Sequence, residues 1–209
     1  MKSLAILFYS LIGINLYSAE IRTPDYIKYK GQTLTISNSP MELYFELYPE
    51  LVPKPDIFWI HTNKNYSAVY ELKDSVLYLI EINIERLTND SSYNKVNVIS
   101  EIFEGQSRVE MDWLSTILII EPESFQKGKY EIIHFDKGKL RSTKMAKLKQ
   151  VKKLKHNLFE EFTHTDEFLQ IKKQHSDWTN ESIEQIVVRD KILEYSSQID
   201  NNKTPHNTK

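Results

Sequence analysis

The hydrophobic pattern of this 209-residue chain changes its period once, near Met145. Before that point, β-branched and aromatic residues alternate with polar ones over short stretches, which is typical of strands. After it, a stripe recurs at three- and four-residue steps, which is typical of helices. The stripe consists of Leu148, Val151, Leu158, Phe162, Thr165 and Leu169, with Lys155 as its one basic member. The sequence therefore predicts an α+β fold, a largely antiparallel sheet with helices packed on one face, followed by a C-terminal helical appendage.

Several short stretches predict the strands and their connections. Gly31 separates two β-type runs in "DYIKYKGQTLTIS", and Lys73-Asp74 separates "SAVYELK" from "SVLYLIEINIE", so each pair predicts an antiparallel hairpin. Within the longest run, alternation places Val76, Tyr78, Ile80, Ile82 and Ile84 together on the buried face. The stretches "DIFWIHT", "STILIIE" and "KYEIIHF" predict further strands, and "DKGK" predicts a hairpin into a final one.

Three stretches predict helices. Ser39, Pro40 and Glu42 have the spacing of a capping box with proline at the first helical position, and Pro49 ends that helix. A second helix is expected over residues 92–104, with Gly105 just beyond its end and with an inward face of Val96, Ile99, Ile102 and Phe103. A helix over residues 180–196 is expected within the appendage.

The N-terminal stretch "MKSLAILFYSLIGINLYSAE" has the layout of a secretory signal peptide, with Lys2 before an apolar run and small residues after it. We therefore expect a signal peptide over residues 1–19 and a protein that is exported, either periplasmic or secreted. Retention of this stretch as an N-terminal anchor is the alternative. The remaining divisions are an α+β domain over 20–144, the helical appendage over 145–198 and a disordered tail over 199–209.

The chain contains no cysteine. This excludes disulfides, thiolate metal sites and cysteine nucleophiles, so the exported domain has to be stabilised by its hydrophobic core. The absence of cysteine, the low glycine content and the abundance of lysine indicate a bacterial envelope or secreted protein.

Residues 137–156 contain nine Lys or Arg and no acid, although the formal net charge of the whole chain is −2. Lys147, Lys152 and Lys155 flank the apolar stripe of the expected helix, a pattern typical of a helix that binds a partner protein or an anionic lipid surface. The alternative is a solvated helix face whose apolar stripe packs on the domain itself. Nucleic acid is not expected as a partner, because the segment has almost no arginine and no aromatic residue for base stacking.

Enzyme signatures are sparse, so the sequence leans against an enzyme. The motifs Gly-x-Ser-x-Gly, Ser-x-x-Lys and a phosphate-binding glycine loop do not occur. The best acid pair is Glu110 and Asp112 beside Trp113, which favours, as an alternative, a hydrolase that acts on envelope polymers with two carboxylates.

No cofactor or metal is expected. Glu161 and His164 have the spacing that places a carboxylate and an imidazole on one helix face, but a di-iron site needs two such motifs. Tyrosines are concentrated in the N-terminal half, at Tyr26, Tyr29, Tyr44, Tyr48, Tyr66, Tyr70 and Tyr78. If some of them share an open sheet face with acids, that face would suit a basic protein partner.

The stretches "DYIKYKGQTLTISNSPMELYFELYPELVPKPD" and "YELKDSVLYLIEINIE" resemble the start of exported bacterial proteins without an assigned activity, and the similarity extends loosely through "DWLSTILIIE" and "HFDKGKL". The resemblance implies export and a bacterial origin, and it assigns no functional residue. Small proteins of this kind can accompany secreted toxins as immunity partners. The sequence thus favours a non-enzymatic protein-binding module, in one form a toxin-neutralising one, that uses either an acidic tyrosine-rich sheet surface or the basic helix.

Overall fold

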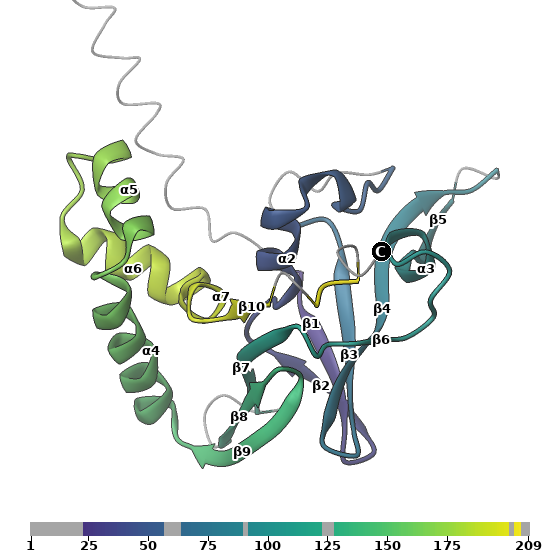
Figure 1. Cartoon of the computed structure of the whole chain (residues 1–209), viewed down its shortest axis with the longest axis horizontal. Helices are drawn as coiled ribbons and strands as arrows, with labels where there is room; N and C mark the ends of the chain where they lie inside the picture. The colour runs from purple at the N-terminus through teal and green to yellow at the C-terminus, as the bar shows by residue number, and fades with distance from the viewer. Residues whose placement is uncertain (1–22, 57–63, 90–91, 123–127, 201–202, 206–209) are drawn as a thin grey trace, which may run out of the picture.

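A computed structural model describes residues 23–56, 64–89, 92–122, 128–200 and 203–205 of the chain. The signal peptide expected over 1–19 and most of the strand expected in "DIFWIHT" lie outside these ranges. The described part contains both helices and a sheet, so the predicted α+β class is confirmed (Figure 1).

Seven strands form a closed barrel in the order β7, β2, β1, β3, β4, β9, β8, and β8 pairs again with β7. The strands are β1 (Asp25–Tyr29), β2 (Gln32–Ile36), β3 (Ser67–Lys73), β4 (Val76–Leu87), β7 (Leu114–Ile120), β8 (Tyr130–Asp136) and β9 (Lys139–Ala146). All of these pairings are antiparallel except the one between β1 and β3. Three short strands extend the sheet, β5 (Tyr93–Asn97) and β6 (Val109–Glu110) on β4 and β10 (Gln198–Ile199) on β7.

The prediction of an open sheet with helices on one face is therefore wrong. Alternation along a strand shows which side is buried, but it does not show whether the two end strands meet. Two seams are narrow, because β2 meets β7 only at the pair Ile36 and Ile120, and β4 meets β9 only at Val76 and Lys139. Register irregularities in the β3–β4 and β8–β9 ladders supply the strand bending that closure requires.

Two-residue loops join three of the hairpins. The loops are Lys30–Gly31, Asp74–Ser75 and Lys137–Gly138, and all six residues have positive φ. This is the geometry of type I′ turns, whose twist matches that of the flanking strands. The predicted hairpins are thus confirmed, although the loop between β3 and β4 lies one residue later than expected.

The predicted buried face of β4 is right for only half of the strand. Ile82 and Ile84 are buried as expected, but in the first half Leu77 and Leu79 are fully buried instead of Val76, Tyr78 and Ile80. The register shift opposite Val69 and Tyr70 explains the change, because one extra residue moves every later side chain to the other face.

Helix α2 (Met41–Leu47) forms where it was predicted, but its capping box does not. The backbone N–H of Ser39 donates to Oε1 of Glu194 at 2.7 Å, and the Glu42 carboxylate accepts from the hydroxyl of Tyr66. Both predicted capping groups are thus used for tertiary contacts.

The helix expected over residues 92–104 is wrong. Residues 93–97 form β5 against β4, and only α3 (Ile99–Ile102) is helical. The side chains of Ile99, Ile102 and Phe103 are nevertheless buried as predicted. Pairing with β4 overrides the local helical pattern here.

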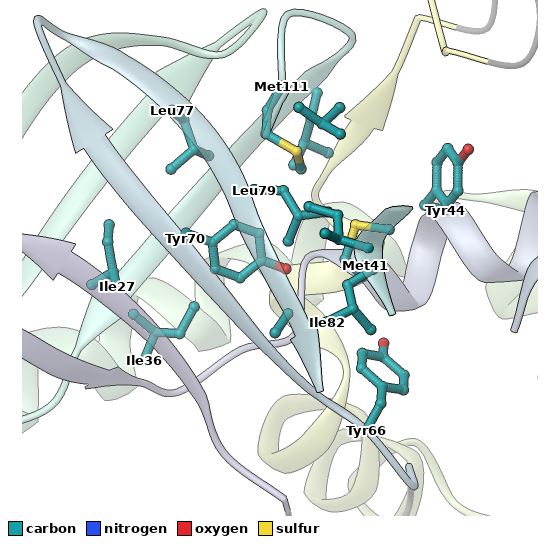
Figure 2. Packing of buried hydrophobic residues seen from close by; sticks show 14 of the residues in the cluster. Ile27, Ile36, Met41, Tyr44, Tyr66, Tyr70, Leu77, Leu79, Ile82 and Met111 are labelled. Atoms are coloured by element: carbon teal, nitrogen blue, oxygen red, sulfur yellow. The ribbon is translucent and has the colours of Figure 1, made fainter. Parts of the chain in front are cut away.

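The barrel interior holds the main core (Figure 2). Ile27, Tyr70, Leu79 and Met111 converge there from four strands or their ends, and Met41 of α2 closes one side. Trp113 is also fully buried in this cluster, where its ring centroid lies 4.9 Å from that of Tyr44.

The second core lies between the outer side of β7 and β8 and the C-terminal helices, which gather beside these strands in Figure 1. The helices are α4 (Leu148–Phe162), α5 (Asp166–Gln174), α6 (Asn180–Asp190) and α7 (Ile192–Tyr195). Phe159, Phe162 and Phe168 pack edge to face at its centre. Of the predicted stripe, Val151 and Phe162 are buried, whereas Leu148 and Leu169 are exposed.

The helical part docks on the barrel through buried polar contacts. Besides the contact of Glu194 with Ser39, the hydroxyls of Ser197 and Thr116 lie 2.7 Å apart. Thr204, within the stretch expected to be a disordered tail, is fully buried, and its hydroxyl lies 2.8 Å from that of Tyr48. This part of the expected tail therefore packs against α2 and its following turn.

We expect the contact between α4 and α6 to weaken as the pH rises. Nδ1 of His156 lies 2.5 Å from Oε1 of Glu184, and Glu160 lies 3.9 Å from the other ring nitrogen. The hydrogen bond with Glu184 raises the pKa of His156 in the folded protein. The contact between the two side chains therefore stabilises the fold fully below the pKa of an unfolded histidine, about 6.5, and this stabilisation is lost as the pH rises through the pKa of His156 in the folded protein. An NMR titration of the imidazole should show this raised midpoint, and Glu184→Gln should lower it. An unchanged midpoint in that variant would contradict the assignment.

Candidate protein-binding surface

The exposed cations of the basic segment follow one another along β9 and the first turns of α4. We call this the basic surface and define it by Arg141, Lys144, Met145, Lys147, Leu148, Lys149, Lys152 and Lys153, all of which are exposed. The predicted binding residues Lys147 and Lys152 belong to it. Lys155 is half-buried and has a partner, so it lies at the margin of this surface.

Hydrogen bonds between Lys147 and Gln150 hold the backbone at the start of α4. The N–H of Lys147 donates to Oε1 of Gln150 at 2.8 Å, and its carbonyl accepts from the N–H of Gln150. The first turn contains no acid. The contact with Gln150 caps the helix start, but cations are unfavourable at the positive end of a helix dipole, so the charges of the lysines do not serve the stability of α4. The helix end adds to the positive potential that its lysines create.

The lysines of the basic surface are not neutralised within the described part of the chain. Arg141 binds the carboxylate of Asp136, but Lys144, Lys147, Lys149, Lys152 and Lys153 have no ion pair with any described residue. An acidic partner could therefore bind these five side chains without breaking an existing contact.

Two large apolar side chains lie between these cations. Met145 is 53% exposed and Leu148 is 45% exposed, although both belong to ordered secondary structure. An apolar centre with a charged rim is the usual composition of a protein interface.

Strand β9 has one edge that no described strand covers. The strand pairs with β8 along its length except at the bulged residue Arg141, but with β4 only at Lys139, after which the N–H of Leu140 donates to the carbonyl of Ser75. Figure 1 shows β9 running past this seam toward α4. Residues 142–146 therefore present alternate backbone N–H and C=O groups on their free side.

The structure places the candidate catalytic acids on and just after β6. Glu110 is exposed opposite Tyr78 of β4, and Asp112 forms an ion pair with Lys203 at 3.6 Å. Met111, between them, is fully buried and its N–H donates to the carbonyl of Leu77. Their use as a carboxylate pair stays a prediction.

Glu161 and His164, whose spacing resembles half of a di-iron site, do not lie on one helix. Helix α4 ends at Phe162, so His164 lies beyond the helix that contains Glu161. Among the residues that the structure describes, no group of three or more His, Asp or Glu side chains is placed to hold a metal ion.

The tyrosine-rich surface stays a prediction, and the structure shows how far its side chains are exposed. Tyr44, Tyr66 and Tyr70 are buried, and the other four tyrosines named above are half-buried. On the outer side of β3 and β4, Arg108 lies 3.7 Å from the ring centroid of Tyr78 and binds Glu71 at 2.9 Å. The carboxylate of Glu71 is thus already neutralised.

A buried polar network beneath α2 is the arrangement that sequence reasoning missed. Nζ of Lys64 lies 2.5 Å from Oδ1 of Asp25, which also accepts from the N–H of Ala68 at 2.7 Å. Burial raises the pKa of the Asp25 carboxyl, which the charge of Lys64 offsets only in part. Burial likewise raises the pKa of Tyr66, whose hydroxyl binds Glu42. The side chains of Asp25 and Lys64 are 0% and 2% exposed, so this network is closed to a substrate.

Comparisons with protein-family models, with curated proteins and with solved structures found no match. The resemblance to exported bacterial proteins therefore stays a prediction. Within the described residues, no helix is both long enough and apolar enough to cross a membrane.

Proposed function

We propose that this protein is a non-enzymatic binding protein of the bacterial envelope that holds an acidic protein partner on its basic surface. The observation that carries the proposal is the set of five exposed lysines without a described ion-pair partner within residues 144–153, a stretch that also exposes Met145 and Leu148. A chain with a net charge of −2 has acids enough to neutralise them, yet none lies within reach of them in the described part. Neutralisation of a secreted toxin is one concrete form of this function.

The surface suits a protein better than a lipid bilayer. Its apolar content is confined to two side chains, whereas a helix that lies in a bilayer presents a continuous apolar face. The apolar face of α4 is instead used inside the protein, because Val151, Phe159 and Phe162 are buried in the second core. What remains exposed is a charged rim beside an uncovered strand edge.

The triple variant Lys144→Glu, Lys147→Glu and Lys152→Glu should lower partner affinity by at least about tenfold at low salt, because three attractive charge contacts become repulsive. The control replaces Lys54, Lys95 and Lys173 by Glu, which changes the net charge equally at exposed sites outside the basic surface. Both variants and the unaltered protein are tagged and used to capture proteins from envelope and secreted fractions at low and high salt.

One protein recovered near equimolar ratio by the unaltered protein and the control, but not by the charge-reversed variant, would support the proposal. If the unaltered protein, the control variant and the charge-reversed variant all recover this protein equally, the basic surface is not its binding site. Vesicles with and without anionic lipid are tested in parallel. Salt-sensitive binding to the anionic vesicles alone, without a captured protein, would replace the protein partner by a lipid surface.

A further inference from the structure

The uncovered edge of β9 is long enough to add a strand. Ser142–Ala146 comprises five residues, a usual length for a strand in a sheet, and its pairing with β8 holds it extended beyond the bulge at Arg141. The β4 side of β9 is occupied only at the first residues, by Val76 and by the carbonyl of Ser75. The rest of the edge runs beyond the turn between β3 and β4.

Side chains on both faces of this segment are accessible. Arg141, Ser142, Thr143, Lys144 and Met145 are all exposed, and only Ala146 is buried, against the helices. An added strand would therefore meet no covering layer on either side of the ribbon. In most of the barrel, by contrast, one face of each strand belongs to a core.

The charges on β9 favour an acidic strand over a second copy of this chain as the strand that pairs with its free edge. A second copy of this chain, paired edge to edge, would place the Lys144 side chains of the two copies close together, which is unfavourable. A strand with acidic side chains would meet cations on β9 and, at its end, Lys147 at the start of α4. Lysine on an edge strand also discourages aggregation, but the exposed Met145 on the same edge works against a purely protective role.

We propose that residues 142–146 of β9 bind an extended acidic segment of the partner protein as an added β-strand. The inference rests on the proposed function and gives it a mode of recognition, in which backbone hydrogen bonds supply affinity and the flanking cations select acidic side chains.

The test uses the tagged full chain and a short blocked peptide in which Glu alternates with Val. A second peptide of the same sequence carries N-methyl groups on consecutive central peptide bonds, so that neither of its edges can pair, while its charge is unchanged. We expect the first peptide to bind at low salt and the N-methylated peptide to bind at least about tenfold more weakly. Amide hydrogen exchange should show new protection within 142–146 in the first complex.

Equal binding of both peptides, with both weakened by the charge-reversed triple variant, would overturn strand addition and leave the basic surface as a binding site. Absence of binding by either peptide at low salt would also overturn it. The proposed function is then judged separately by the capture experiment, which requires no strand pairing. Protection at β5 instead of β9 would likewise contradict the proposal, because β5 is another exposed strand that pairs with only one described neighbour.

Discussion

Replacing Gly138 with alanine is expected to destabilise the protein by about 3 kcal/mol or more, because it disrupts the seam that closes the barrel. A Cβ atom at this position would lie 2.6 Å from the carbonyl oxygen of Met111 and 2.9 Å from the amide nitrogen of Asp112, and φ is +67°. The same residue donates its N–H to Leu114 and accepts from the N–H of Leu77. Backbone atoms cannot move aside without breaking these hydrogen bonds, so the whole seam would have to shift.

Gly31→Ala is the matched control for this experiment. Gly31 occupies the equivalent position of the β1–β2 loop with φ of +79°, but no heavy atom lies within 4 Å of its added Cβ. Only the cost of a left-handed alanine remains, about 1 kcal/mol. The free energy of unfolding from urea titrations gives both values. Equal losses in the two variants would contradict the close contact between the β8–β9 loop and the Met111 backbone.

The second large effect is expected for Lys64→Met, which should destabilise the protein by about 3–5 kcal/mol near pH 7. Methionine keeps most of the side-chain volume but leaves the carboxylate of Asp25 buried without its cation. Lys28→Met is the control, since Lys28 pairs with Glu81 at the surface, where the side chains are 47% and 35% exposed. That variant should lose less than about 1 kcal/mol.

The pH dependence of the Lys64→Met loss has a definite sign. Burial raises the pKa of Asp25 in the folded protein. Protonation of Asp25 therefore contributes to the free energy of unfolding fully below the unfolded pKa of about 3.9, and this contribution is lost as the pH rises through the pKa of Asp25 in the folded protein. Removal of the cation raises that folded pKa further. The loss measured in urea should therefore be smaller at about pH 4 than at about pH 7. A loss that grows on acidification would contradict the buried ion pair.

The hairpins and helix that depend on residues close together in the sequence could be predicted. The β1–β2 and β8–β9 hairpins follow from glycine at the turn and alternation on either side, and α2 follows from Pro40 and the spacing of Tyr44 and Phe45. Each of these rests on residues close together in the sequence, so no distant partner is needed to form it.

The errors arise where distant partners decide the outcome. The inverted first half of β4 depends on a register shift against β3, and β5 is a strand because β4 lies beside it. Barrel closure depends on the single pairs at Ile36 and Val76 with strands far along the chain. None of these contacts leaves a periodic signal in the sequence.

The candidate site was partly visible in the sequence. The run of cations from residue 137 identified the segment, and Lys147 and Lys152 lie on the basic surface. Of the two surfaces that the sequence offered, the basic one was limited to the helix, whereas the structure adds the exposed side chains of Arg141, Lys144 and Met145 from β9. The signal for these residues was present in "KLRSTKMAK", but their exposure depends on β9 extending past its neighbour β4.

The central claim is that the basic surface is where a partner binds. Its most direct test is amide hydrogen exchange on the full chain, alone and in complex with the protein recovered in the capture experiment. We expect slowed exchange within residues 141–153, with little change on the outer side of β1 and β3. Slowed exchange on β1 and β3, with residues 141–153 unchanged, would contradict it and would move the binding site to the tyrosine-bearing face of the barrel.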